Sequence, residues 1–173
     1  MKEEQAHVRE FMVKADQPLP DRPTLPPIQI RIGRLKWIAE ELCELANAYG
    51  VEIDLNNHGN TTGNFAAFQL PPEKCQFQDP MDALTQAYDA TLDLLVFGVG
   101  TGLAMGTDLT PGWLEVHRTN MLRFGPGGYK RADGKWIRPP DWQPPNLKAI
   151  ILHQIEYAEA ADAVRKSQAE LGL

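Results

Sequence analysis

Two long segments carry apolar residues at the spacing of an α-helix, and this periodicity constrains the fold more than any other feature. In residues 28–49 the apolar positions are Leu35, Ile38, Leu42, Leu45 and Tyr49. In residues 81–105 they are Leu84, Tyr88, Leu92, Leu95 and Val99. A stripe that recurs every three or four residues predicts an amphipathic helix. Few segments alternate with period two, so the predicted fold class is all-α.

Shorter segments complete the predicted organisation. Residues 2–15 and 146–171 also have helical spacing, and prolines between residues 18 and 27 predict an extended connection. Thr110 followed by Pro111 predicts a helix start, with Thr110 as the N-cap. Residues 50–80 lack a period and are rich in turn formers, so we expect a loop with short elements. The length of 173 residues predicts one domain over residues 1–173.

Charge and composition exclude several classes of protein. The chain has 17 Lys and Arg against 23 Asp and Glu, a net charge of -6, which argues against a nucleic-acid partner. No apolar run is long enough to predict a membrane span, and the N-terminus has no secretory pattern, so we expect a cytoplasmic protein. Cys43 and Cys75 have no metal-binding spacing and are interpreted as ordinary thiols.

Acidic residues form a row on each long predicted helix. The first row is Glu40, Glu41 and Glu44, and the second is Asp82, Asp89 and Asp93. Both rows are expected to lie away from the apolar stripes, and a solvated acidic face is the commoner explanation. The small residues Ala46, Ala48, Ala90 and Thr91 would let another helix approach and bury the rows. Carboxylates that close would need a cation, and oxygen ligands favour Mg²⁺ or Mn²⁺.

A basic segment follows in an otherwise acidic chain. Its polar and basic residues are Arg118, Asn120, Arg123, Lys130, Arg131, Lys135 and Arg138. Glycine turns with Lys and Arg are able to hold a polyphosphate, although a solvent-exposed basic loop is the commoner use and no Walker A pattern is present. Tyr129, Trp136 and Trp142 either stack on a base or pin the loop to the core, and pinning is favoured.

Taken in order, these motifs resemble a known family. EELCE in the first helix, DATLD in the second, then EVHRTNMLRF and KRADGKWIRP are similar to the all-α nucleoside triphosphate pyrophosphohydrolases. That family includes MazG, the dimeric dUTPases and phosphoribosyl-ATP pyrophosphatase. The resemblance is to compact MazG-like members and covers roughly residues 8–150.

The resemblance implies a fold, an activity and a site. The fold is a MazG-like four-helix-type core with an additional terminal helix and long loops, usually in a dimer or tetramer. The activity is hydrolysis between the α and β phosphates, with two or three Mg²⁺ or Mn²⁺ ions. The implied metal ligands are Glu41, Glu44 and Asp93, with Asp89 replacing the family glutamate that would fall on Ala90. Glu40 or Glu41 would accept a proton from water, and the implied substrate-binding residues are Arg118, Asn120, Lys130, Arg131 and Lys135.

A narrower resemblance, to phage-encoded members that supply a 2-aminoadenine DNA pathway, implies dGTP and GTP as substrates. The groups that would read guanine are sought in the 50–80 loop, at Asp54, Asn56, Asn57 and Asn64. Three alternatives remain open: a catalytically inactive nucleotide-binding module, a dUTPase-type or house-cleaning enzyme, and a structural helical protein.

Overall fold

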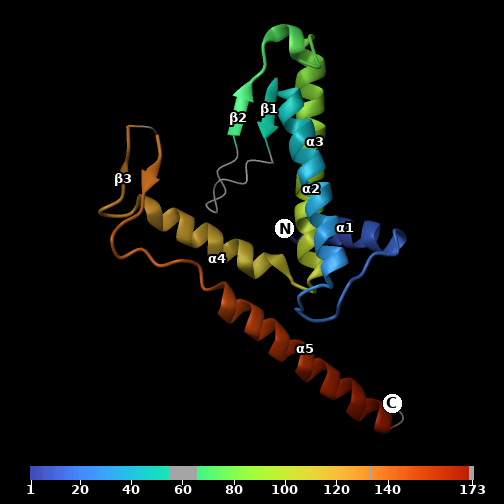
Figure 1. Cartoon of the computed structure of the whole chain (residues 1–173). Helices are drawn as coiled ribbons and strands as arrows, with labels where there is room; N and C mark the ends of the chain where they lie inside the picture. The colour runs from blue at the N-terminus through green and yellow to red at the C-terminus, as the bar shows by residue number, and fades with distance from the viewer. Residues whose placement is uncertain (55–65, 133, 172–173) are drawn as a thin grey trace. The chain divides into compact units, whose positions relative to one another are not determined.

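The computed structural model describes residues 1–54, 66–132 and 134–171 (Figure 1). Its helices are α1 (Lys2–Lys14), α2 (Ile28–Ala48), α3 (Pro80–Ala104), α4 (Leu109–Met121) and α5 (Leu147–Glu170). Two single 3-10 turns are η1 (Pro72–Lys74) and η2 (Leu122–Phe124). The strands are β1 (Val51–Asp54), β2 (Ala66–Gln69), β3 (Tyr129–Lys130) and β4 (Trp136–Ile137), and they pair as two antiparallel hairpins. The described residues are therefore mainly helical, as predicted.

The helix ends follow from local capping. Gly50 adopts φ of 64° directly after Tyr49, the C-cap of α2, and glycine enters this conformation without steric cost, so the helix ends there. The predicted start of α4 is wrong by two residues. Asp108 is the N-cap, and its carboxylate accepts a hydrogen bond from the Thr110 backbone N–H at 2.8 Å. Aspartate caps a helix at least as well as threonine, so the helix begins at Leu109 and Pro111 is its third residue.

The chain divides into two compact units. Unit 1 contains residues 1–25 and 102–173, and unit 2 contains residues 26–101. Unit 2 is continuous in sequence, whereas unit 1 is assembled from both ends of the chain. The single-domain assignment stays a prediction, and each unit is described by itself below.

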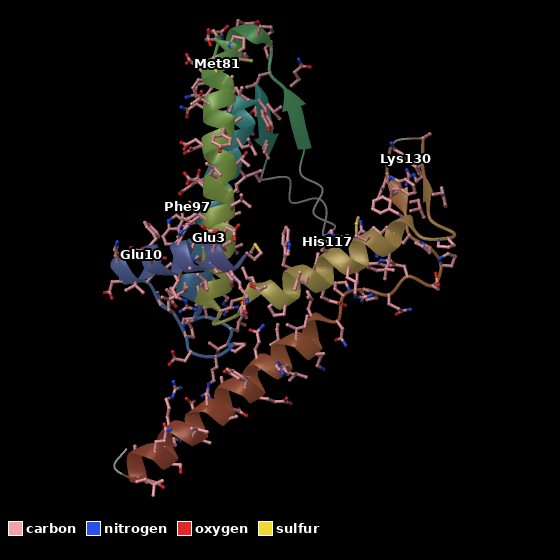
Figure 2. The ribbon with its side chains drawn as sticks, turned by 180° about the vertical axis from the view of Figure 1, so that it is seen from behind. Glu3, Glu10, Met81, Phe97, His117 and Lys130 are labelled. Carbon is pink, nitrogen blue, oxygen red and sulfur yellow. The ribbon has the colours of Figure 1, made fainter. Side chains whose placement is uncertain are left out.

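In unit 2, α2 and α3 pack side by side in opposite directions (Figures 1 and 2). Trp37 of α2 stacks on Phe97 of α3 with ring centroids 5.6 Å apart. Ala90 lies two turns before Phe97 on the same face of α3 and is only 2% exposed. Its burial shows that this face of α3 is covered within the protein.

The predicted apolar stripe of α3 lies on the other side of that helix. Four of its members are 42% to 67% exposed in the single chain: Leu84, Tyr88, Leu92 and Leu95. Of the predicted stripe only Val99 is buried. The face of α3 that meets α2 therefore carries small and acidic residues, and the more apolar face of α3 is exposed among the described residues.

In unit 1, two glutamine side chains hold the terminal helices to the beginning of α4. Gln5 of α1 donates to Asp108 Oδ1 at 3.1 Å and to Thr110 Oγ1 at 2.9 Å, and its carbonyl accepts from the Leu109 backbone N–H at 2.8 Å. Gln154 of α5 accepts from the Asp108 backbone N–H and donates to the Asp108 carbonyl, both at 2.9 Å. The start of α4 is thus the junction of three helices that are distant in sequence.

Membrane-spanning capacity was judged on the described residues. No single helix among them is both long and apolar enough to cross a bilayer, and α3 and α4 meet that criterion only when taken together across the turn between them, by length and composition alone.

Gly106 is expected to be the glycine of this turn that tolerates substitution least. Its φ is 68°, and a Cβ there would lie 2.3 Å from the backbone carbonyl oxygen of Arg22. We expect Gly106→Ala to destabilise unit 1 by at least about 1–2 kcal/mol, the cost of a left-handed conformation with a side chain. Urea-induced unfolding measures the loss.

The matched control for this substitution is Gly98→Ala in the interior of α3. A Cβ at Gly98 meets nothing within 4 Å, so alanine is expected to be neutral or to stabilise by about 0.5–1 kcal/mol. Equal stability of the two variants would show that the turn does not depend on the conformation of Gly106.

Candidate active site

The structure brings the acidic residues of α2 and α3 together in unit 2. Glu41 interacts electrostatically with Glu40 and Glu44 on its own helix and with Asp89 and Asp93 on α3. The antiparallel packing explains this, because Trp37 and Phe97 fix the register and Glu41 and Asp93 each lie one turn further along. Glu41 therefore faces α3, which agrees with the approach of another helix onto the acidic rows better than with a solvated acidic face.

Glu41 is the least favourably placed of these carboxylates. Burial raises the pKa of Glu41 above its usual 4.5, and the negative charges of Glu44, Asp93, Asp89 and Glu40 raise it further. Its Oε2 atom is buried and has no hydrogen-bond partner among the described residues. A buried oxygen without a partner is costly, and buried charges are normally paired or bound to a metal. Glu40, Glu44 and Asp89 are exposed, and Asp93 is half-buried.

The oxygen donors of these residues suit Mg²⁺ or Mn²⁺, but their side chains do not converge on one ion position. The donors are carboxylate oxygens, which hard divalent cations prefer, and the buried Oε2 of Glu41 lacks a partner that a cation would supply. In residues 1–54, 66–132 and 134–171, however, no three Asp, Glu, His or Cys side chains lie close enough to hold one ion. The carboxylate side chains of α2 and α3 would have to change rotamer to form a coordination shell.

The predicted substrate-binding residues Lys130, Arg131 and Lys135 lie on a hairpin of unit 1, and Figure 2 labels Lys130 on its strand. In this hairpin β3 pairs with β4, with Lys130 opposite Trp136. The tight turn is closed by the Arg131 N–H, which donates to the Lys135 carbonyl at 2.8 Å, and by Gly134 at φ of 86°. All three basic side chains are exposed. The hairpin thus presents three cations on one short loop, in the other unit from the carboxylates.

Arg118 and Asn120 lie near the end of α4, in unit 1. Arg118 forms a two-pronged ion pair with Glu115, with both N–O distances at 2.8 Å. The hydrogen bonds from Arg118, and then from the Asn146 backbone N–H, lower the pKa of Glu115 to about 2. The charge of Arg118 is therefore already paired with a carboxylate. This pairing does not support the prediction that Arg118 binds substrate. The three-residue spacing of Glu115 and Arg118 on a helix was the available signal, and it was missed.

Aromatic residues pin the basic segment to α4 and η2, as predicted for two of the three. The Trp142 indole N–H donates to the Thr119 carbonyl at 2.8 Å, and Arg138 lies over its ring at 4.2 Å. Trp136 packs edge-on against Phe124 with centroids 5.0 Å apart. Tyr129 is 58% exposed and does not share this role.

Arg34 is a second residue that the sequence analysis missed. It lies two turns before Glu41 on the same face of α2, is only 5% exposed, and lies 5.2 Å from the centre of the Trp37 ring. Burial lowers the pKa of Arg34. Its spacing of seven residues from Glu41 was a signal that this cation shares the packed face of α2.

Comparison with known proteins adds no relative to this picture, since the chain matches no family model and no curated protein.

Neutralising Glu41 is expected to stabilise unit 2 in the absence of metal. Because the pKa of Glu41 is raised in the folded state, its contribution to stability is fully present below the unfolded value of about 4.5 and is lost as pH rises through the folded value. Glu41→Gln should therefore raise the melting temperature at pH 7 in EDTA, and this gain should vanish below pH 4.5.

The control is Glu52→Gln on β1, where the side chain is exposed. Its melting temperature should follow that of the unmodified chain at every pH. A lower melting temperature for Glu41→Gln at pH 7 would contradict this prediction. It would mean that the Glu41 carboxylate has a stabilising partner in the folded protein.

Proposed function

We propose that this protein hydrolyses nucleoside triphosphates between the α and β phosphates in the presence of Mg²⁺ or Mn²⁺, releasing a monophosphate and pyrophosphate. The observation that supports the proposal most is the buried, unpartnered carboxylate oxygen of Glu41, which faces acidic residues from two helices. A cluster of this kind is expected where a divalent cation completes the charge balance. The ordered motifs EELCE, DATLD and KRADGK support the same reaction through the family resemblance.

Each group has a role that follows from its charge. When bound, divalent cations would neutralise the triphosphate and make a bound water more acidic. Glu41, Glu44, Asp89 and Asp93 would hold them, two or three in number by the resemblance. Glu41, or Glu40 beside it, would accept the proton of the attacking water, a task for which a raised pKa suits a carboxylate near neutral pH. Lys130, Arg131 and Lys135, with Asn120, would stabilise the charge of the departing pyrophosphate.

Guanine nucleotides are the proposed substrates, on the narrower resemblance to phage-encoded members. Reading guanine requires an acceptor for its N1–H and N2 amino groups. Of the candidates, Asn56, Asn57 and Asn64 lie outside the described residues, and of Asp54 only the backbone position on β1 is described. The reaction itself is independent of this base preference.

The enzyme is also proposed to act as a homo-oligomer, a dimer or tetramer. The exposed apolar stripe of α3 is the surface of unit 2 best suited to meet a second copy, because exposed apolar patches mark interaction sites. No role is proposed for nucleic acid or a membrane.

A catalytically inactive nucleotide-binding module is the second candidate. It is favoured by Ala90, which takes the place of the second-motif glutamate of the family, and by the lack of a converged ligand set among the described residues. Such a module would bind nucleotide and metal without turnover.

Turnover of the eight common ribo- and deoxyribonucleoside triphosphates distinguishes these candidates. With Mg²⁺ or Mn²⁺, we expect equimolar pyrophosphate and monophosphate, chiefly from dGTP and GTP. Products from other bases would retain the mechanism and remove the guanine preference. Metal-dependent nucleotide binding without product would establish the inactive module, and inorganic phosphate as the first product would contradict cleavage at the α phosphorus.

Single substitutions in the carboxylate cluster test the site itself. Glu44→Gln and Asp93→Asn should each lower turnover by at least about 100-fold, since even partners of metal ligands are worth about 10–100-fold. Metal binding should also stabilise the unmodified chain and raise its melting temperature. The expected gain in the free energy of unfolding is about 2.7 kcal/mol at a metal concentration 100 times the dissociation constant. Both cluster variants should lose most of this stabilisation, whereas the control Glu73→Gln, at an exposed residue of η1, should keep the turnover and the metal stabilisation of the unmodified chain. Full activity of either cluster variant would remove that residue from the site.

Lys135→Ala tests the hairpin. We expect it to weaken triphosphate binding by about tenfold, or 1.4 kcal/mol, and monophosphate binding much less, because the side chain is assigned to the leaving pyrophosphate. Competition binding with both nucleotides gives the ratio, and Lys148→Ala on exposed α5 is the control. Equal losses for the two nucleotides would contradict a polyphosphate role.

A further inference from the structure

A cavity of about 880 Å³ lies within unit 1, between α1, α5 and the turn that leads into α4. One face of each terminal helix forms its walls, with Ala6 on α1 and Ala158 and Ala161 on α5. Leu103 and Pro111 line it from the side of the turn. The volume falls in the range of sites for small molecules, and such sites are mainly apolar with a few polar groups.

Hydrogen bonds fix the positions of the two helices that form the walls of this cavity. Gln5 of α1 and Gln154 of α5 both line the cavity, and both form hydrogen bonds with the start of α4. Gln5 is 8% exposed, so its three hydrogen bonds to the start of α4 are shielded from water. These polar contacts therefore set the spacing of α1 and α5, and direct packing of the two helices on each other is not needed. A binding site that is preformed in this way loses little entropy when a ligand enters.

The charged side chains that line the cavity are three cations, Lys2, Arg9 and Arg165, and two carboxylates, Asp21 and Asp108. The Asp108 carboxylate is engaged by Thr110 and Gln5, and Arg165 is paired with Asp162. Lys2 and Arg9 lie seven residues apart on one face of α1. Lys2 interacts electrostatically with Asp108, and neither cation forms a hydrogen bond or an ion pair with another described residue. Two cations without an ion-pair partner among the described residues thus border an apolar cavity.

We propose that this cavity binds a small organic phosphate, with its apolar part against Ala158 and Ala161 and its phosphate beside Arg9 or Lys2. Arginine and lysine are the side chains that recognise phosphate. A peptide is less well suited, because extended peptides commonly add to a sheet edge and none of the residues that line the cavity lies in a strand. The site lies in unit 1, shares no residue with the carboxylate cluster of unit 2, and does not depend on the proposed hydrolysis.

Backbone NMR titration of the full chain in EDTA tests this proposal without involving metal or turnover. The probes are phenyl phosphate, phenol and inorganic phosphate. We expect phenyl phosphate to shift the amides of Ala6, Thr107 and Ala161, and to bind more tightly than either of its two parts. Arg9→Glu should weaken this binding by at least fivefold, whereas Lys14→Glu, with the same change of charge at an exposed end of α1, should not. Ala158→Phe, which fills the cavity, should abolish it.

The remaining outcomes overturn the proposal. Shifts that are confined to unit 2, or that are unchanged in both Arg9→Glu and Ala158→Phe, would show that the cavity takes no phosphate. Shifts at Ala6 and Ala161 caused by a short acidic peptide but not by phenyl phosphate would assign the groove to a peptide partner. Because the experiment contains no divalent cation, a failure here leaves the turnover assay of the carboxylate cluster unaffected.

Discussion

The antiparallel packing of α2 against α3 is the constraint on which unit 2 and its candidate site depend. The stacked pair Trp37 and Phe97 fixes the register, and Ala90 is buried two turns before Phe97 on the same face of α3. That register brings Glu41 opposite the aspartates of α3. Any shift of one helix by a turn would separate these groups by about 5 Å and relieve their repulsion, so the packing energy must exceed the electrostatic cost.

Much of the secondary structure was predictable, because it depends on neighbours in sequence. The long helices end within two residues of their predicted bounds, and Gly50 follows the end of α2 in a left-handed conformation that favours glycine. Which face of α3 is covered was not predictable, since periodicity reports a stripe and not its partner. The stripe at Leu84 and Tyr88 is exposed, while the acidic side meets α2.

The candidate site was predictable in its residue types but not in its pairings. The acidic spacing indicated one cluster, and the structure gathers the residues from both helices around Glu41. The pairing of Arg118 with Glu115, and the burial of Arg34, depend on where particular side chains come to lie. Composition alone treats all arginines as equal, whereas an arginine already held by a carboxylate has little charge left to offer a phosphate.

The discontinuous course of unit 1 has a consequence for how the chain is made. Residues 26–101 form a continuous unit, and all of its contacts are available once that stretch has left the ribosome. Unit 1 must wait, because Gln5 of α1 meets Asp108 and Thr110 only after about a hundred further residues have been made. Gln154 reaches the same junction later still. Helix α1 therefore stays without these partners while the residues between them are made, and closure of unit 1 is set by the arrival of α5.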